Sequence, residues 1–158
     1  MDEGSGRLLP GSAAMTFLVC EDGSEYTDRF SRFLGAQFRF ARAGHFAEAL
    51  ALAPGADALL LDLDFRRTAP ALLVDESGRP DPRCAVEVQG ILILRALRSW
   101  GVALPAVLFA DLDDRAHAAR LESELAPLRI LPSSEGLPRI AQLLRDLVSS
   151  ATGRVAKS

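Results

Sequence analysis

The feature that most constrains the fold is a short run of purely apolar residues that ends in an acid. Residues 58–61 read Ala-Leu-Leu-Leu, and Asp62 follows them directly. A strand without polar residues is covered on both of its faces, which is typical of the central strands of parallel sheets. Because parallel neighbours are joined by crossover connections that usually contain a helix, the run predicts an α/β protein.

Short apolar segments alternate with segments of helical periodicity along the rest of the chain. Strands are expected at residues 16–20, 37–42, 58–62, 105–110 and 128–131, each followed by a helix. Five such βα units, with acids after the first and third strands, predict a doubly wound parallel sheet with strand order 2-1-3-4-5. Phe33 in the first helix and Trp100 in the third belong to the predicted apolar faces, and Trp100 is expected in the core.

The chain is expected to form one folded domain between two tails. Its 158 residues suffice for a single domain of ordinary size. Residues 1–14 and 151–158 are small, polar and aperiodic, so we expect flexible tails on either side of a domain at residues 15–150. Residues 66–89 are polar and contain prolines, and they exceed the usual length of a βα loop. This inserted loop is interpreted either as a partner-binding loop or lid, or as a disordered segment.

Charge and hydropathy argue against two classes of partner. The net charge is -3, and no block of Lys or Arg marks a nucleic-acid interface. The sequence lacks the uninterrupted run of about 18 apolar residues that a membrane helix requires, so no membrane span is expected. The cytoplasm is the expected location, and Cys20 and Cys84 are expected to be free thiols.

Three carboxylates are expected to meet at one edge of the sheet. Glu21 and Asp22 follow the first predicted strand, and Asp62 ends the third. In this strand order, the carboxyl ends of these two strands flank the crevice in which α/β proteins bind ligands. Close carboxylates raise one another's pKa unless a cation or hydrogen bonds compensate, and Mg²⁺ is the natural cation for oxygen ligands. Alternatively, Glu21 and Asp22 are interpreted as caps of the helix that follows.

Several of these residues together resemble the receiver domain of two-component response regulators. They are the acidic pair after the first strand, the D-x-x-x-x-D run from Asp57 to Asp62, Gly90 before the third helix and Pro105 at the start of the fourth strand. The resemblance spans about residues 16–149 and implies the flavodoxin-like receiver fold. By the same resemblance, Asp62 would accept the phosphoryl group.

The resemblance also implies a metal site. Glu21, Asp22 and Asp62 would hold Mg²⁺, and the backbone carbonyl of Asp64 would complete its coordination. We expect this binding to be weak, and we expect no other cofactor.

The chain departs from the receiver pattern at two positions that normally contact the phosphoryl group. Ala110 ends the fourth strand where receivers carry Ser or Thr, and Leu131 ends the fifth strand where they carry Lys. Each loss removes a charge-assisted hydrogen bond worth about 1.5 to 3 kcal/mol. Arg66 and Arg67 are interpreted either as replacements for the lost Lys or as exposed loop residues.

These departures favour a protein-interaction function. We expect a stand-alone atypical receiver, or pseudo-receiver, that binds other signalling proteins or a second copy of itself in bacterial signal transduction, independently of phosphorylation. Its interaction face would comprise the fourth helix, the fifth strand and the fifth helix. The candidate contacts on this face are Arg120, Glu124, Arg129, Arg139 and Asp146.

The alternative function is that of a working receiver. In that case a histidine kinase would phosphorylate Asp62 with the help of Mg²⁺. An enzyme is not expected, because the sequence has no Gly-rich phosphate loop, no G-x-S-x-G motif and no Cys/His or Ser/His pair at the strand ends.

Overall fold

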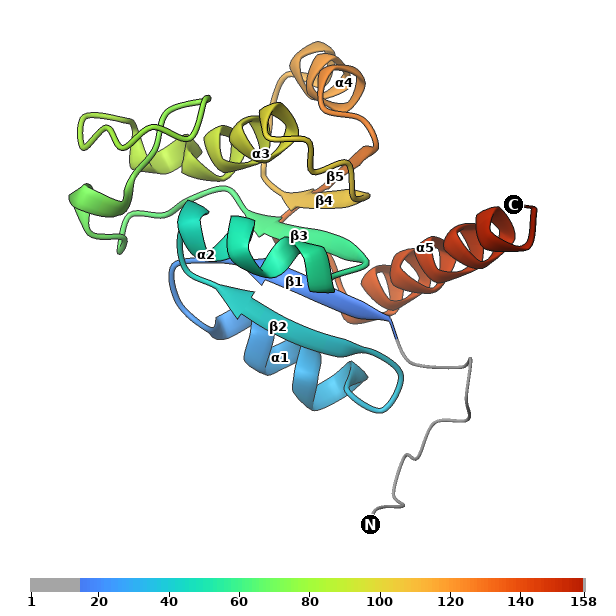
Figure 1. Ribbon diagram of the computed structural model, residues 1–158. Coiled ribbons are helices and arrows are strands. Elements are labelled where there is room, and N and C mark those ends of the chain that lie inside the picture. The colour runs from blue at the N-terminus through green and yellow to red at the C-terminus, as the bar shows by residue number, and fades with distance from the viewer. Residues whose placement is uncertain (1–14, 158) are drawn as a thin grey trace.

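The centre of the molecule is a parallel sheet of five strands in the order β2-β1-β3-β4-β5 (Figure 1). The computed structural model describes residues 15–157, so the predicted tail at residues 1–14 lies outside the described residues. The strands are β1 (Thr16–Cys20), β2 (Arg39–Ala43), β3 (Ala58–Asp62), β4 (Ala106–Phe109) and β5 (Leu128–Leu131). The predicted doubly wound α/β sheet and its strand order are confirmed.

Within residues 15–157, five α-helices cover the two faces of the sheet. They are α1 (Glu25–Leu34), α2 (Phe46–Leu52), α3 (Gln89–Ser99), α4 (Arg115–Glu124) and α5 (Leu137–Lys157). Side chains of α2, α3 and α4 pack with Leu59 and Leu61 on one face, and those of α1 and α5 pack with Ala58 and Leu60 on the other. Because successive residues of β3 point to opposite faces, this central strand has to be apolar throughout.

The last helix is longer than the sequence predicted. α5 continues to Lys157, so residues 151–157 are helical and do not form the loose tail that we expected from residue 151. This segment contains a single glycine, Gly153, and no proline. One glycine costs a helix only about 1 kcal/mol, so nothing in the segment forces the helix to end.

Two large apolar side chains lie outside the core that the sequence predicted for them. Phe33 is 58% exposed and Trp100 is 60% exposed. Trp100 is the C-cap residue of α3, so it lies just beyond the last residue of the helix. Its indole N–H donates to the carbonyl of Ser77 at 3.0 Å, and its ring packs edge-on against Phe46. Trp100 therefore supports the inserted segment instead of filling the core.

The inserted segment at residues 66–89 has a defined conformation. It contains two short 3-10 helices, η2 (Pro70–Leu72) and η3 (Val86–Val88), and a β-bridge between Val74 and Pro80. A third such helix, η1 (Ala53–Gly55), follows α2. The side chain of Gln89 is buried and binds both backbone groups of Val74, accepting from its N–H at 2.9 Å and donating to its carbonyl at 3.1 Å. The segment is thus packed against α3 and does not form a disordered loop.

We expect Gln89→Leu to loosen the inserted segment. The substitution leaves the buried N–H and carbonyl of Val74 without partners, which costs about 2 kcal/mol of the free energy of unfolding. Urea unfolding measures this loss, and amide hydrogen exchange at Val74 locates it. Gln142→Leu on the exposed face of α5 is the matched control, with a change of at most about 0.5 kcal/mol. Equal unfolding midpoints for the two variants would contradict the role assigned to Gln89.

Candidate functional site

The acidic residues lie around a hollow at the carboxyl edge of β1 and β3. Cys20 at the end of β1 pairs with Leu61 in β3, so the residues that follow these two positions are neighbours. The hollow has a volume of about 320 Å³. It is lined by Glu21, Glu25, Tyr26, Arg29, Asp62, Arg67 and Ser133. The structure therefore brings Glu21 and Asp62 together, as we expected from the strand order.

Glu21 is turned into the protein and serves the helix that follows. Its side chain is buried, and one oxygen accepts a hydrogen bond from the N–H of Tyr26 at 3.0 Å. The other oxygen accepts from the N–H and the hydroxyl of Thr27, at 2.8 and 2.7 Å. These donors belong to the first turn of α1, whose N–H groups have no partners within the helix. Of the two interpretations offered by the sequence, helix capping describes Glu21.

Asp22 does not cap the helix but forms an ion pair with Arg67. Its carboxylate accepts hydrogen bonds from the backbone N–H of Arg67 at 2.8 Å and from Nη2 at 3.0 Å. The same guanidinium binds both oxygens of Glu25 at 2.9 Å. This pairing lowers the pKa of Glu25 to about 2 and raises that of Arg67. Arg67 is therefore bound to the acids after β1, and among the described residues it forms no bond with Asp62.

The neighbouring arginine has a different partner. Arg66 binds the carboxylate of Asp64 through its backbone N–H and Nε, both at 2.8 Å. This hydrogen bonding holds the pKa of Asp64 below its usual range. The two arginines that the sequence singled out thus neutralise Asp64 and Asp22, and neither one is bonded to Asp62 among the described residues.

Asp62 forms no ion pair among the described residues, and it accepts fewer hydrogen bonds than Glu21 does. One of its oxygens accepts the N–H of Leu63 at 2.9 Å. Partial burial raises the pKa of Asp62 to about 6, the Leu63 N–H opposes this shift, and the charges of Asp22 and Glu21 add to it. A carboxyl group with such a pKa changes its charge near neutral pH.

Gly90 allows α3 to approach the end of β3. A Cβ at this position would collide with the carbonyl oxygen of Asp62 and would lie 2.9 Å from the Cα of Leu63. The N–H of Gly90 donates to the carbonyl of Leu63 at 3.0 Å. The glycine noted in the sequence is thus needed for close backbone contact beside Asp62.

The two altered receiver positions are buried and apolar. Ala110 is 5% exposed, and Leu131 is 3% exposed and packs with Phe109 and Ile140 on the α5 face of the sheet. A different hydroxyl reaches the hollow, because Ser133 lines it from the loop after β5. Ser133 donates from its backbone N–H and from its hydroxyl to the carboxylate of Asp111.

Tyr26 and Ser133 are site residues that the sequence analysis missed. The ring of Tyr26 stacks on Phe109 with 4.9 Å between the ring centroids. Burial, followed by the charges of Asp62 and Glu21, raises the pKa of its hydroxyl to about 12. In the sequence Tyr26 has only the helical spacing of an apolar-face residue, and nothing in the spacing of Ser133 predicts that it lines the hollow.

The residues expected to bind Mg²⁺ do not fit that role in this arrangement. Glu21 has both oxygens hydrogen-bonded to α1, and the carboxylate of Asp22 is paired with Arg67. Among the described residues, no group of three His, Cys, Asp or Glu side chains has a geometry that could hold a metal ion. Protein donors thus occupy the carboxylates of Glu21 and Asp22, whereas Asp62 accepts one backbone N–H among the described residues.

The residues of the predicted interaction face fall into separate groups. Arg129, Arg139 and Asp146 line one shallow hollow of about 190 Å³ between β5 and α5. Glu124 lies apart from them, because it is bound to Arg95 of α3 at 2.9 and 3.1 Å. Arg120 is exposed on α4. The structure thus brings three of the five predicted contacts together.

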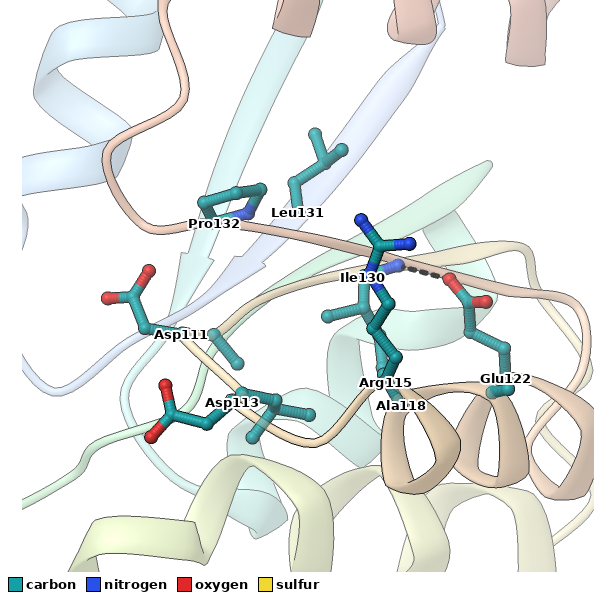
Figure 2. A pocket seen from close by; sticks show the side chains of 11 residues that line it. Asp111, Asp113, Arg115, Ala118, Glu122, Ile130, Leu131 and Pro132 are labelled. Carbon is teal, nitrogen blue, oxygen red and sulfur yellow. Dashed lines mark hydrogen bonds between the residues drawn. The ribbon is translucent and has the colours of Figure 1, made fainter.

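A larger hollow lies between α4, β5 and the loop after β4 (Figure 2). Its volume is about 530 Å³. Leu112, Ala118 and Ile130 provide apolar lining, and Asp111 and Asp113 lie at one end. On the opposite side, Glu122 of α4 accepts a hydrogen bond from the backbone N–H of Ile130 at 2.9 Å. β5 is an edge strand, so this bond covers part of an edge that could otherwise pair with another chain.

Comparison with solved structures identifies the same fold in receiver domains. The receiver domain of a Francisella response regulator has a TM-score of 0.63 at 16% identity, over 87% of this chain and 98% of that one. A response regulator receiver domain protein from Clostridium thermocellum has a TM-score of 0.61 at 14% identity, over 87% and 97%. The Vibrio cholerae chemotaxis protein CheY4 has a TM-score of 0.59 at 15% identity, over 85% and 99%.

The likeness to these proteins is one of fold. No protein-family model matches the sequence, and no curated protein matches it. The identities are so low that the structures establish the flavodoxin-like receiver architecture and nothing further about this chain. Within residues 15–157, no helix combines the length and the apolar character needed to cross a membrane.

Asp62→Asn is expected to stabilise the protein in a pH-dependent manner. The pKa of Asp62 rises from 3.8 to about 6 on folding, so the wild type loses stability as the pH rises through this range, whereas Asn stays neutral. We expect a gain of about 1 kcal/mol at neutral pH, less than the full shift implies because water reaches the carboxylate, and no gain below about pH 4.

Urea unfolding of the wild type and the variant between pH 4 and pH 8 measures this difference. Asp113→Asn is the matched control, because Asp113 is exposed in the loop between β4 and α4. A stability difference between wild type and Asp62→Asn that does not change with pH would contradict the raised pKa.

Proposed function

We propose that this chain is a receiver-like signalling domain that acts through protein–protein contacts and without phosphorylation of Asp62. The observation that carries the proposal is the Asp22–Arg67 ion pair beside Asp62. It ties up an acid that the receiver resemblance assigns to Mg²⁺. The phosphoryl chemistry of receivers depends on that ion, and the proposed domain therefore works without it.

The two altered positions support the same proposal. Ala110 and Leu131 supply neither the hydroxyl nor the cation that receivers direct at the phosphoryl group. Two charge-assisted hydrogen bonds together are worth about 3 to 6 kcal/mol. A loss of this size corresponds to a reduction in phosphoryl stabilisation of roughly two to four orders of magnitude.

The proposed interaction surface comprises α4, β5 and α5. The 530 Å³ hollow on the α4 side of β5 combines an apolar lining with charged ends, as protein interfaces do. Arg129, Arg139 and Asp146 extend this surface on the α5 side. The proposed partners are other signalling proteins in a bacterial pathway or a second copy of this chain.

One observation favours the second candidate function, a phosphorylated receiver. The side chain of Asp62 is partly exposed in a hollow of about 320 Å³, and Ser133 lines the same hollow. A small phosphoryl donor could enter there, and Ser133 would supply a hydroxyl from the loop after β5 in place of one from β4.

Intact-mass analysis after incubation with acetyl phosphate and Mg²⁺ separates the two functions. We expect no phosphoryl adduct on the wild type, because Asp62 lacks the metal site, the hydroxyl and the cation. Asp62→Asn is the control that reveals adducts at other residues. An adduct on the wild type that disappears in Asp62→Asn would contradict the proposal and support the phosphorylated receiver.

A further inference from the structure

Arg67 joins two segments that lie far apart in the sequence. It belongs to the start of the inserted segment and follows Asp22 by 45 residues. Its backbone N–H and its guanidinium both donate to Asp22, and the guanidinium also binds Glu25. The arginine therefore fastens the loop after β3 to the loop after β1.

The side chains of Asp22 and Arg67 differ strongly in their exposure to water. The side chain of Asp22 is 3% exposed, whereas that of Arg67 is 56% exposed. An ion pair between two exposed side chains contributes little, but a carboxylate withdrawn from water needs hydrogen-bonded or cationic partners to stay charged. Within the described part of the chain, Arg67 supplies every hydrogen bond that the Asp22 carboxylate accepts.

The backbone beside the pair leaves room for the guanidinium. A Cβ at Gly23 would overlap Nη2 of Arg67 and would lie 2.8 Å from its Cζ. The positive φ angles among the described glycines belong to Gly78 and Gly101, so the backbone conformation of residue 23 does not itself require glycine. A side chain at residue 23 would thus collide with both members of the Glu25–Arg67 pair, and glycine leaves room for that pair.

We infer that Arg67 takes, in this chain, the place of a divalent cation at the acidic edge of the sheet. Its guanidinium neutralises Asp22 and Glu25 from within the protein. A Mg²⁺ ion could reach the Asp22 carboxylate only by displacing both the guanidinium and the backbone N–H of Arg67. The inference shares this ion pair with the proposed function and goes beyond it by assigning the pair a role in metal exclusion, whichever proteins bind the domain.

Binding of Mg²⁺ to the wild type and to Arg67→Met tests the inference. Up to about 10 mM MgCl2 is expected to leave the Tm of the wild type equal to that in NaCl of the same ionic strength. The Tm of Arg67→Met is expected to rise saturably with MgCl2, because the freed carboxylates bind the ion in the folded state. Arg66→Met is the matched control, since Arg66 pairs with Asp64, and it should respond as the wild type does.

Gly23→Ala provides a second variant that keeps the arginine. The added methyl group displaces the guanidinium from its position, so this variant should also gain a response to Mg²⁺. We expect Mn²⁺, measured by electron paramagnetic resonance, to bind at least about tenfold more tightly to both variants than to the wild type. Equal affinity in the wild type and both variants, whether measurable or absent, would overturn the inference.

The inference and the proposed function fail on different results. An adduct at Asp62, together with weaker metal binding by the wild type than by Arg67→Met and Gly23→Ala, would refute the phosphorylation-independent function alone. Metal affinity in the wild type equal to that of Arg67→Met and Gly23→Ala, without an adduct at Asp62, would refute the internal cation alone.

Discussion

The parallel sheet brings the ends of β1 and β3 together, and the rest of the site follows from the need to neutralise the acids placed there. Each carboxylate meets this need differently. Glu21 accepts N–H groups from the first turn of α1, Asp22 is held by Arg67, and Asp64 is held by Arg66. Among the described residues Asp62 accepts one hydrogen bond, from the N–H of Leu63, and its pKa is raised to about 6. Groups of the protein itself thus bind the carboxylates of Glu21, Asp22 and Asp64, in place of an ion from solution.

The inserted segment at residues 66–89 contributes to the neutralisation of these acids. Its first residues place Arg67 at the acidic edge. Its later residues are held by the buried hydrogen bonds between Val74 and Gln89. Trp100 supports it from the end of α3 by donating to Ser77. A segment that looks like a variable loop in the sequence therefore has a structural role beside Asp62. Packing of this kind explains why its polar composition does not lead to disorder.

The fold could be predicted from the sequence because the apolar run at residues 58–61 and the periodic helices report on local burial. The same signals locate Asp62 and the altered positions Ala110 and Leu131, but they do not report partners across the chain. The pairing of Arg67 with Asp22 depends on the path of the inserted segment, which no periodicity encodes. Composition likewise predicted a tail at residues 151–157, where the structure has a helix.

The central claim is that the buried carboxylate of Asp22 and Arg67 act as one ion pair, and a double-mutant cycle tests it most directly. The free energy of unfolding would be measured by urea for the wild type, Asp22→Asn, Arg67→Met and the double variant. The account predicts that Arg67→Met is clearly destabilising in the wild type and nearly neutral once Asp22 is replaced by Asn, because the two residues act as one unit. Equal destabilisation by Arg67→Met in both backgrounds would contradict it.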